Sequence, residues 1–286
     1  MTKPVFNISA SYVDAETSEK ALLLMEVNES SFSYVIMDDQ QNMLSTAYFV
    51  ITHVEGRNLA EGLKDIIEAN EILQLPFREA VVVYNFPEST LVPDGFYHHD
   101  VNRDVIDLLF GNLKKGLVLS EKHPQMDVHS VYRVPAAVHS IMQQKFAAGK
   151  YWHIYTLWTS SILSSTVPEG QQMYLVFAAD KVLVAVYRDT QLMLLQSFGY
   201  TTPEDVVYHL LHCSDQLALS QEECTLHISG FIDEDSALFN EIKKYFLKPE
   251  FDVVQAKVLE GSETDDAPLE YPPHYFSYLQ KLALCV

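Results

Sequence analysis

Two histidines and a cysteine give the most recognisable ligand spacing in this chain. His209, His212 and Cys213 lie within about one helical turn of a segment whose apolar residues recur at helical spacing. Imidazole and thiolate groups at this spacing bind zinc in many proteins. No third ligand with suitable spacing follows, and the helix also has a core face to fill. We therefore interpret these histidines as surface or core residues rather than as a metal site.

A second histidine-rich stretch, His98-His99-Asp100, precedes another helical pattern, and Asp100 is predicted to cap that helix. The serine pairs Ser160-Ser161 and Ser164-Ser165 are predicted to pack and cap a helix, because no His–Asp partner is indicated. The sequence contains no Gly-x-Ser-x-Gly, no phosphate loop ending in Gly-Lys-Ser/Thr and no His-Glu-x-x-His. These residues alone therefore indicate no catalytic centre.

The composition is that of an acidic globular protein. The 286 residues include 19 basic and 39 acidic side chains, for a net charge of −20, and 48% are hydrophobic. Nucleic-acid binding requires clustered Lys and Arg, so we expect no nucleic-acid partner. No apolar run is long enough to span a membrane, and the 3 cysteines are unpatterned. We expect a cytoplasmic protein with a protein partner and, as one alternative, a homodimer.

The elements that would position a site follow a pattern that occurs twice. Each half is predicted to run three apolar strands, a helix and a fourth strand. The first half covers Ala21–Val27, Phe32–Asp38, Met43–Ile51, a helix over Leu59–Leu73, and Glu79–Tyr84; the second covers Met173–Ala178, Val182–Tyr187, Gln191–Gly199, a helix over Pro203–Leu217, and Thr225–Ser229. Pro168 and Gly170 interrupt both periodicities, which predicts domains over residues 1–168 and 169–286, the second with a C-terminal helix.

The remaining segments are predicted from the same signals. Residues 1–20 are polar and are predicted either to add an edge strand or to be loose, and Glu260–Pro268 is predicted to be an acidic loop. The further predicted elements are a helix over Asn102–Leu113, a strand over Val128–Val134, a helix over Ala136–Ala148, a strand over Trp152–Thr156, a helix over Leu157–Ser165 and a last helix from His274.

The order of elements from Val128 onward resembles the actin-like ATPase superfamily, and within it the pilus-assembly and type II secretion members. The residues that carry the resemblance are Val131-Tyr-Arg-Val-Pro135, Gly149, Trp152–Thr156, Met173–Gly199 and Ser229-Gly230. The whole chain also resembles an uncharacterised Bacteroidetes family assigned to this superfamily. The resemblance implies an α/β protein with a duplicated, ribonuclease-H-like, two-domain fold, in which helices flank mixed central sheets.

In active members of the superfamily, each half carries an Asp-x-Gly hairpin whose acid positions a metal or its waters. The glycine lets backbone N–H groups approach the phosphates. Aligning Asp38 with Asp189 brings Glu26-x-Asn28 over Phe177-x-Ala179 at these positions. Phe177 cannot bind Mg²⁺ or orient water. The resemblance therefore implies a vestigial nucleotide site of Glu26 and Asn28, with Gly230 on the adenosine side.

These residues favour a non-catalytic, actin-like adaptor or scaffold that needs no cofactor. The alternative is an ATP-binding or ATP-hydrolysing protein, resembling a small-molecule kinase, that uses ATP and Mg²⁺. A ribonuclease-H-like nuclease is disfavoured, because it needs clustered carboxylates for two metals. The aromatic segment from Tyr271 to Tyr278 is interpreted either as an interaction surface or as a seal for the C-terminal helix, and we favour the seal.

Overall fold

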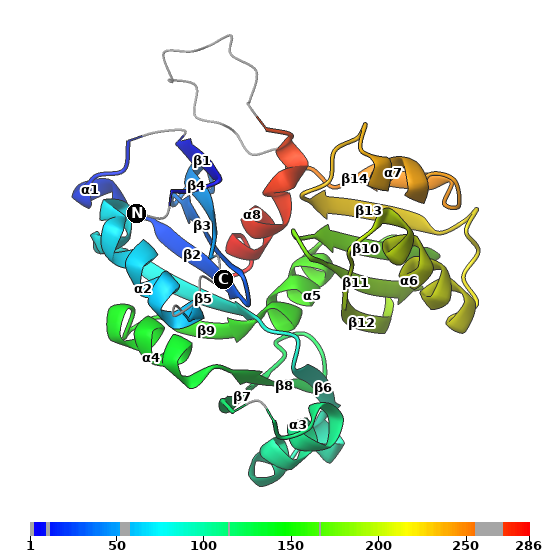
Figure 1. Ribbon diagram of the computed structural model, residues 1–286, viewed down its shortest axis with the longest axis horizontal. Helices are drawn as coiled ribbons and strands as arrows, with labels where there is room; N and C mark the ends of the chain where they lie inside the picture. Colours follow the sequence, from blue (N-terminus) through cyan, green and yellow to red (C-terminus); the bar gives the residue numbers. More distant parts are fainter. Residues whose placement is uncertain (1–2, 10–11, 52–57, 114, 166, 255–270) are drawn as a thin grey trace. The chain divides into compact units, whose positions relative to one another are not determined.

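The computed structural model describes residues 3–9, 12–51, 58–113, 115–165, 167–254 and 271–286. These residues form two compact units (Figure 1). The first unit holds the described residues up to Ser161 together with Leu282–Val286, and the second holds those from Ile162 to Lys281. Helix α5 (Ile154–Ser164) and helix α8 (Ser277–Ala283) each cross a border between the units.

The first unit is built on a six-stranded mixed sheet in the order β1-β4-β3-β2-β5-β9. Its elements are β1 (Phe6–Ser9), α1 (Ala15–Ser18), β2 (Leu22–Asn28), β3 (Ser31–Met37), β4 (Met43–Val50), α2 (Leu59–Ala69), the 3-10 helix η1 (Glu71–Gln74), β5 (Glu79–Asn85), α4 (Ala136–Lys145) and β9 (Lys150–His153). Strands β2 and β3 are buried along their whole length, which explains their nearly continuous apolar sequence. Leu63, Ile66 and Ile67 from α2 and Val138 and Met142 from α4 complete the core.

A small three-stranded sheet, in the order β6-β8-β7, is inserted between β5 and α4 of the first unit. It carries one longer helix, α3, which contacts β7 and β8. Its elements are β6 (Ser89–Pro93), the 3-10 helices η2 (Asp94–Phe96) and η3 (His99–Val101), α3 (Asn102–Phe110), β7 (Leu117–Lys122) and β8 (Val128–Val134).

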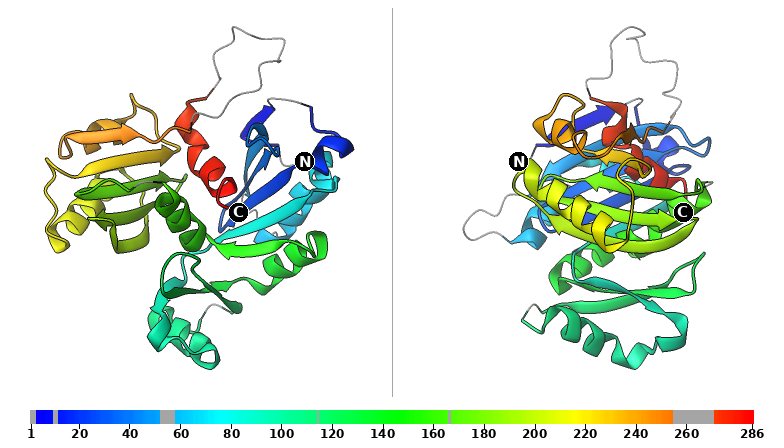
Figure 2. Two further views of the ribbon diagram at one scale, coloured as in Figure 1. Left: turned by 180° about the vertical axis from the view of Figure 1, so that it is seen from behind. Right: turned by 90° about the vertical axis from the view of Figure 1, so that its right-hand side faces the viewer.

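The second unit has a five-stranded sheet in the order β12-β11-β10-β13-β14. Its elements are β10 (Gln171–Phe177), β11 (Lys181–Arg188), β12 (Gln191–Gly199), α6 (Pro203–Gln216), β13 (Thr225–Gly230), α7 (Ala237–Ile242), β14 (Lys248–Phe251) and the 3-10 helix η4 (Pro273–Tyr275). Helices α6 and α7 lie on one face of this sheet (Figures 1 and 2). Their apolar residues, including Leu210 and Phe239, pack with Leu175 and Val184 of the sheet.

The two main sheets share one strand order and one set of directions. In each sheet, three strands that follow one another in sequence pair antiparallel. The first of them, β2 or β10, also pairs in parallel with a later strand, which pairs in parallel with one more: β5 and β9 in the first sheet, β13 and β14 in the second. The first sheet has one additional strand, because β1 pairs antiparallel with β4. Of the two predictions for residues 1–20, the edge strand is confirmed for Phe6–Ser9.

The predicted strands and helices of both halves are confirmed to within a few residues, and Gln191–Gly199 is a strand with those bounds. The helix start at Thr202 is also confirmed, since its hydroxyl accepts the Asp205 N–H and the Asp205 carboxylate accepts the Thr202 N–H. The helix predicted to Leu73 ends at Ala69, and η1 follows. The predicted loop Glu260–Pro268 lies outside the described residues.

The predicted strand Trp152–Thr156 is wrong in its second half, because α5 already begins at Ile154. The Glu121 carboxylate accepts the His153 N–H at 2.7 Å, and His153 Nδ1 accepts the Tyr155 N–H at 3.2 Å. These bonds satisfy backbone donors at the start of a helix. The apolar run that resembles a strand is therefore the buried first turns of α5.

Three further predictions about helix ends are wrong. Asp100 lies in η3 and does not cap α3, whose N-cap position is Val101 without a side-chain bond. Helix α3 ends at Phe110 because Gly111 adopts φ +77°, a conformation that breaks the helix before Leu113. Helix α4 ends at Lys145 rather than Ala148.

Candidate functional site

The hairpin between β2 and β3 holds two of the predicted site residues. Asn28 ends β2, and its Oδ1 accepts the backbone N–H groups of Ser30 at 2.8 Å and Ser31 at 2.6 Å. Its Nδ2 donates to Ser31 Oγ at 2.6 Å. The side chain therefore closes its own turn, as Asn commonly does. Two backbone donors of this turn, the N–H groups of Ser30 and Ser31, are therefore already bonded to Asn28.

Glu26 lies two residues before Asn28, so both side chains leave the same face of β2. The Glu26 side chain is buried, and its Oε1 accepts a hydrogen bond of 2.6 Å from Asn85 Nδ2. Asn85 ends β5, directly opposite Asn28 in the parallel register. The structure thus brings Glu26, Asn28 and Asn85 together as a buried polar group at one end of the sheet.

The matching hairpin of the second unit, between β10 and β11, is apolar where β10 ends, although Asp180 lies in its turn. Phe177 is buried in the core and contacts Tyr200 edge to face. Strand pairing places Phe177 opposite Val182, as Val27 lies opposite Phe32 in the first hairpin. The alignment of Glu26 with Phe177 is therefore displaced by one residue, and the counterpart of Glu26 is the buried Val176. The second hairpin has no carboxylate at this position.

Gly230, the third predicted site residue, ends β13 opposite Phe177. Its φ is +87°, and a Cβ there would lie 2.2 Å from Phe177 O and 2.8 Å from Phe177 N. Phe231 N also donates to Phe177 O at 2.8 Å. The close approach of two backbones therefore accounts for glycine at this position. Gly230 lies in the second unit, whereas Glu26 and Asn28 lie in the first.

A group of exposed apolar side chains on α3 and just after its end is a candidate functional feature that the sequence analysis missed. Leu108 is 85% exposed, Leu109 55%, Phe110 41% and Leu113 95%; we call these four residues the α3 patch. On the opposite side of the helix only Ile106 is a buried apolar residue. Three adjacent apolar residues, Leu108 to Phe110, cannot all share one helix face, and this was the available signal.

Buried polar contacts hold α3 in place beneath this surface. The guanidinium group of Arg133 on β8 is 5% exposed and pairs with Glu88 at 2.7 Å and with Asp107 of α3. It also donates to the Gly111 carbonyl at 3.2 Å. At the other end of the helix, Asn102 Nδ2 donates to Ser120 Oγ at 3.0 Å. The patch is therefore presented by a helix fixed at both ends.

Comparison with known proteins identifies the family of this chain. The sequence matches, over residues 10–248, the family described as Protein of unknown function (DUF3822). The chain belongs to this family. A search among curated proteins finds no match.

Solved structures establish the fold as that of the actin-like ATPases. A Bacteroides thetaiotaomicron protein with an actin-like ATPase fold and unknown function superposes with a TM-score of 0.74 at 18% identity, covering 85% of this chain and 94% of that one. The PilM-PilN type IV pilus biogenesis complex gives 0.55 at 12% identity, with 92% and 97% covered. The ethanolamine utilization protein EutJ from Carboxydothermus hydrogenoformans gives 0.50 at 7%, with 92% and 89% covered. The predicted fold class, that of the actin-like ATPases, is confirmed.

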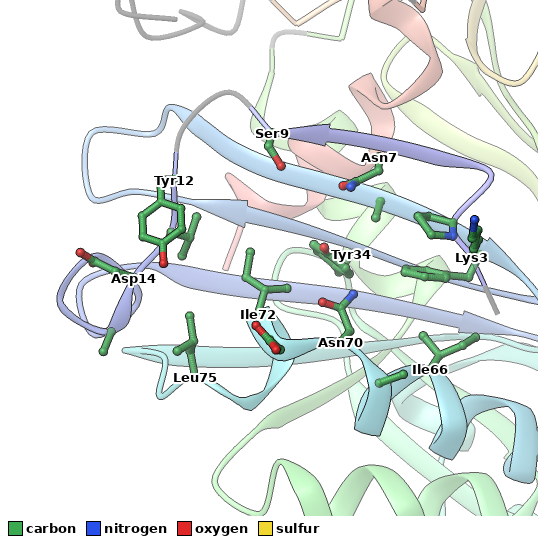
Figure 3. A pocket seen from close by; sticks show the side chains of 17 residues that line it. Lys3, Asn7, Ser9, Tyr12, Asp14, Tyr34, Ile66, Asn70, Ile72 and Leu75 are labelled. Carbon is green, nitrogen blue, oxygen red and sulfur yellow. The ribbon is translucent and has the colours of Figure 1, made fainter. Parts of the chain in front are cut away.

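The first unit of this actin-like chain also has a pocket of about 910 Å³ beside β1. Asn7 and Ser9 enter it from β1, and Asn70 lies across from them after α2 (Figure 3). The floor is largely apolar, with Tyr34, Ala47, Phe49, Ile66, Ile72 and Leu75. This size is within the range of small-molecule sites, and the rim also carries charged side chains from Lys3, Asp14 and Glu71. Glu26 and Asn28 are not among its lining residues.

Two titratable groups connect the small sheet to its neighbours, Glu121 to His153 of β9 and His123 to Thr159 of α5. Burial raises the pKa of Glu121 on β7 to about 7, even though it accepts the His153 N–H. Burial lowers the pKa of His123 to about 4. His123 Nδ1 accepts the backbone N–H groups of Gln125 and Met126, so Nε2 carries the proton and faces Thr159 Oγ1 at 2.9 Å. Both groups fix the small sheet, and neither belongs to the polar group around Glu26.

The remaining candidates from the sequence have structural partners. His209 stacks on Phe198 with centroids 4.6 Å apart, and Tyr208 stacks with His212 at 6.0 Å. Among the described residues, no group of three or more His, Cys, Asp or Glu side chains is arranged to hold a metal ion. No described helix is long and apolar enough to cross a membrane.

The aromatic segment near the C-terminus seals the second unit, as favoured above. His274 stacks on Phe251 with ring centroids 4.0 Å apart, and Tyr275 contacts Phe231 edge to face. His274 Nε2 donates to the Ile232 carbonyl at 2.7 Å. The rings are thus bonded to the segment that follows β13.

Proposed function

We propose that this chain is a non-catalytic actin-like domain that acts in the cytoplasm as an adaptor or scaffold through protein–protein contacts. The α3 patch is the observation that carries the proposal. Large apolar side chains, exposed on α3 and just beyond its end while buried polar contacts hold the helix in place, are typical of a protein-binding surface. Leu108 and Leu113 leave most of their apolar surface in water, and a bound partner would bury it.

The hairpins support the non-catalytic part of the proposal. In the first hairpin the Ser30 and Ser31 N–H groups are bonded to Asn28, so a phosphate would have to displace that side chain. In the second hairpin, Val176 and Phe177 offer no ligand to Mg²⁺. A nucleotide bound by either hairpin would therefore lack the contacts that hydrolysis requires.

The partner in this proposal is a protein. The PilM-PilN neighbour is a type IV pilus biogenesis complex, and we propose a role in protein assembly of this general kind. Nucleic acid is disfavoured as a partner by the net charge of −20.

Affinity purification of the tagged full chain from its native cell, after chemical crosslinking, tests the proposal. We expect one or more proteins to co-purify with the wild type and to be lost with the double variant Leu108→Ser/Leu113→Ser. The matched control Leu247→Ser/Val253→Ser changes exposed apolar residues of the second unit (64% and 45% exposed) and should retain the partner. An unchanged set of co-purifying proteins with the α3 variant would contradict the proposal.

The alternative is a protein that binds ATP and Mg²⁺. Glu26 keeps a carboxylate at the first hairpin, and Gly230 keeps the left-handed glycine of the adenosine-side turn. Under this alternative Glu26, Asn28 and Gly230 contact the nucleotide, and Asn28 must release the Ser30 and Ser31 N–H groups. Binding of Mg-ATP to the wild type but not to Glu26→Ala would favour the alternative over the adaptor.

A further inference from the structure

The outer edges of the two main sheets differ. In the first unit, β4 is covered by β1, which pairs from Phe6 opposite Tyr48 to Ser9 opposite Ser45. In the second unit, β12 occupies the position of β4 in the strand order. No strand among the described residues pairs with the outer edge of β12 (Figure 1). The same topology therefore accepts an added antiparallel strand in one unit and leaves its place open in the other.

Strand β12 lacks most of the features that protect an open edge. Its nine residues, Gln-Leu-Met-Leu-Leu-Gln-Ser-Phe-Gly, include no charged side chain and no proline. Edge strands of soluble proteins commonly carry such residues, because unpaired N–H and C=O groups otherwise pair with another chain. One bulge lies near the start of the strand, opposite Val186 and Tyr187, and the pairing from Leu194 to Gly199 is regular.

Aromatic residues extend this surface beyond the strand. Phe198 of β12 stacks on His209 of α6, and Tyr208 contacts the same histidine edge to face. The Tyr208 ring is 65% exposed, and Met193 on the strand is 42% exposed. Exposed aromatic and methionine side chains are enriched at protein interfaces. The open edge is therefore flanked by groups that a partner strand and its neighbours can bury.

We propose that the β12 edge pairs antiparallel with the β12 edge of a second copy of this chain, across a two-fold axis near Leu195. Self-pairing fits the strand because, with Leu195 opposite its own copy and Gln196 opposite Leu194, every facing residue is uncharged and no like charges are opposed. Each copy uses its edge once, so the assembly closes as a dimer. A strand without charge offers no electrostatic means of selecting a foreign partner, which favours the second copy over an extended peptide.

This inference goes beyond the adaptor role and does not depend on it, since β12 and α3 belong to different units. It also predicts a distinctive salt dependence. Two chains of net charge −20 repel each other, and salt screens that repulsion while leaving backbone hydrogen bonds intact. The dimer should therefore strengthen as the salt concentration rises.

Sedimentation velocity of the full chain, between about 5 and 200 µM protein and in about 0.05 and 0.5 M NaCl, tests the dimer. Gln196 is exposed on β12, and we expect both Gln196→Glu and Gln196→Lys to weaken self-association about tenfold, because each places like charges across the axis. The controls Gln221→Glu and Gln221→Lys add the same charges at another exposed glutamine of this unit and should change association less than about threefold.

The two signs of charge separate pairing from general repulsion. If only the overall negative charge governed association, Gln196→Lys would strengthen the dimer as Gln221→Lys does. A monomer throughout the concentration and salt range, or a dimer that Gln196→Lys strengthens, would overturn the proposal. Hydrogen exchange gives a second readout: amides of Gln191–Gly199 should exchange more slowly in the dimer than in the monomer. Equal exchange of these amides in a dimeric sample would also overturn it.

Discussion

The hairpins β2–β3 and β10–β11 occupy the same place in two sheets of the same strand order, yet they hold opposite kinds of residue. The first ends in Glu26 and Asn28, which are bonded to Asn85, Ser30 and Ser31. In the second, β10 ends in Val176, which is buried, and Phe177, which belongs to the core. Strand order is set by buried apolar strands and their connections, so it persists whether a hairpin is polar or apolar. The fold therefore predicts where a site would lie, and only the hairpin residues predict what it can bind.

The apolar hairpin should have the largest effect on stability. Phe177→Ala removes a fully buried ring and leaves a cavity, and we expect a loss of about 3–5 kcal/mol in the free energy of unfolding. Equilibrium urea unfolding measures it. Phe96→Ala, at a side chain that is 77% exposed, should cost less than about 0.5 kcal/mol. Similar losses of unfolding free energy in the two variants would show that the Phe177 side chain does not stabilise the core.

Gly230 tests whether the approach of β13 to the apolar hairpin fixes the glycine. Gly230→Ala should cost about 3 kcal/mol, because the added Cβ meets the Phe177 backbone at a φ of +87°. Gly170 has the same φ but open space around its Cβ position, so Gly170→Ala should cost only about 1–2 kcal/mol. Thermal unfolding compares the two variants. Equal costs would mean that the conformation, and not the contact with Phe177, demands glycine.

The free energy of unfolding of the first unit should depend on pH through Glu121. Its folded-state pKa of about 7 lies above its ordinary value of 4.5, so the folded protein holds this proton more tightly than the unfolded chain. The stability it contributes is fully present below about pH 4.5 and is lost as the pH rises to about 7. Glu121→Gln should therefore gain about 2–3 kcal/mol relative to wild type between pH 5 and pH 8. Urea unfolding at both pH values measures this gain, and a difference that does not change with pH would contradict it.

The polar hairpin should show the smallest effect. Asn28→Ala removes three hydrogen bonds and leaves two buried or half-buried N–H groups without their acceptor, which should cost about 1–2 kcal/mol. Ser31→Ala removes only the bond from Asn28 Nδ2 and should cost about 0.5–1 kcal/mol. Urea unfolding ranks the two. If Asn28→Ala cost no more than Ser31→Ala, the backbone bonds of Asn28 would not be what holds the first hairpin.

Much of the fold could be predicted because its signals are local. Buried strands such as Leu22–Asn28 are apolar throughout, and the Thr202 and Asp205 capping box marks the start of α6. The start of α5 could not be predicted, because it depends on a bond from Glu121, which is distant in sequence. The pairing of β1 with β4 was left open for the same reason: the sequence of Phe6–Ser9 does not name its partner strand.

The site was predicted less completely than the fold. The alignment of Asp38 with Asp189 places the second hairpin one residue too far along the chain. The reason is that the turn after β3 and the turn after β11 differ in length, so residues in these turns do not mark equivalent positions in the two hairpins. The bonds of Asn28 are contacts within four residues and could be anticipated from the tendency of Asn to close turns. Which side chains of α3 are exposed depends on the contacts of the helix with Arg133 and Ser120. Both residues lie outside the helix, so the sequence of the helix alone does not predict the α3 patch.

Thermal unfolding with and without millimolar Mg-ATP tests the central claim, that this actin-like chain has lost its nucleotide site. A nucleotide present at about 100 times its dissociation constant would stabilise the folded state by about 2.7 kcal/mol. The account predicts no shift in the unfolding temperature of the wild type beyond that seen with Mg²⁺ and inorganic phosphate. A clear upward shift with Mg-ATP that Glu26→Ala abolishes would contradict it.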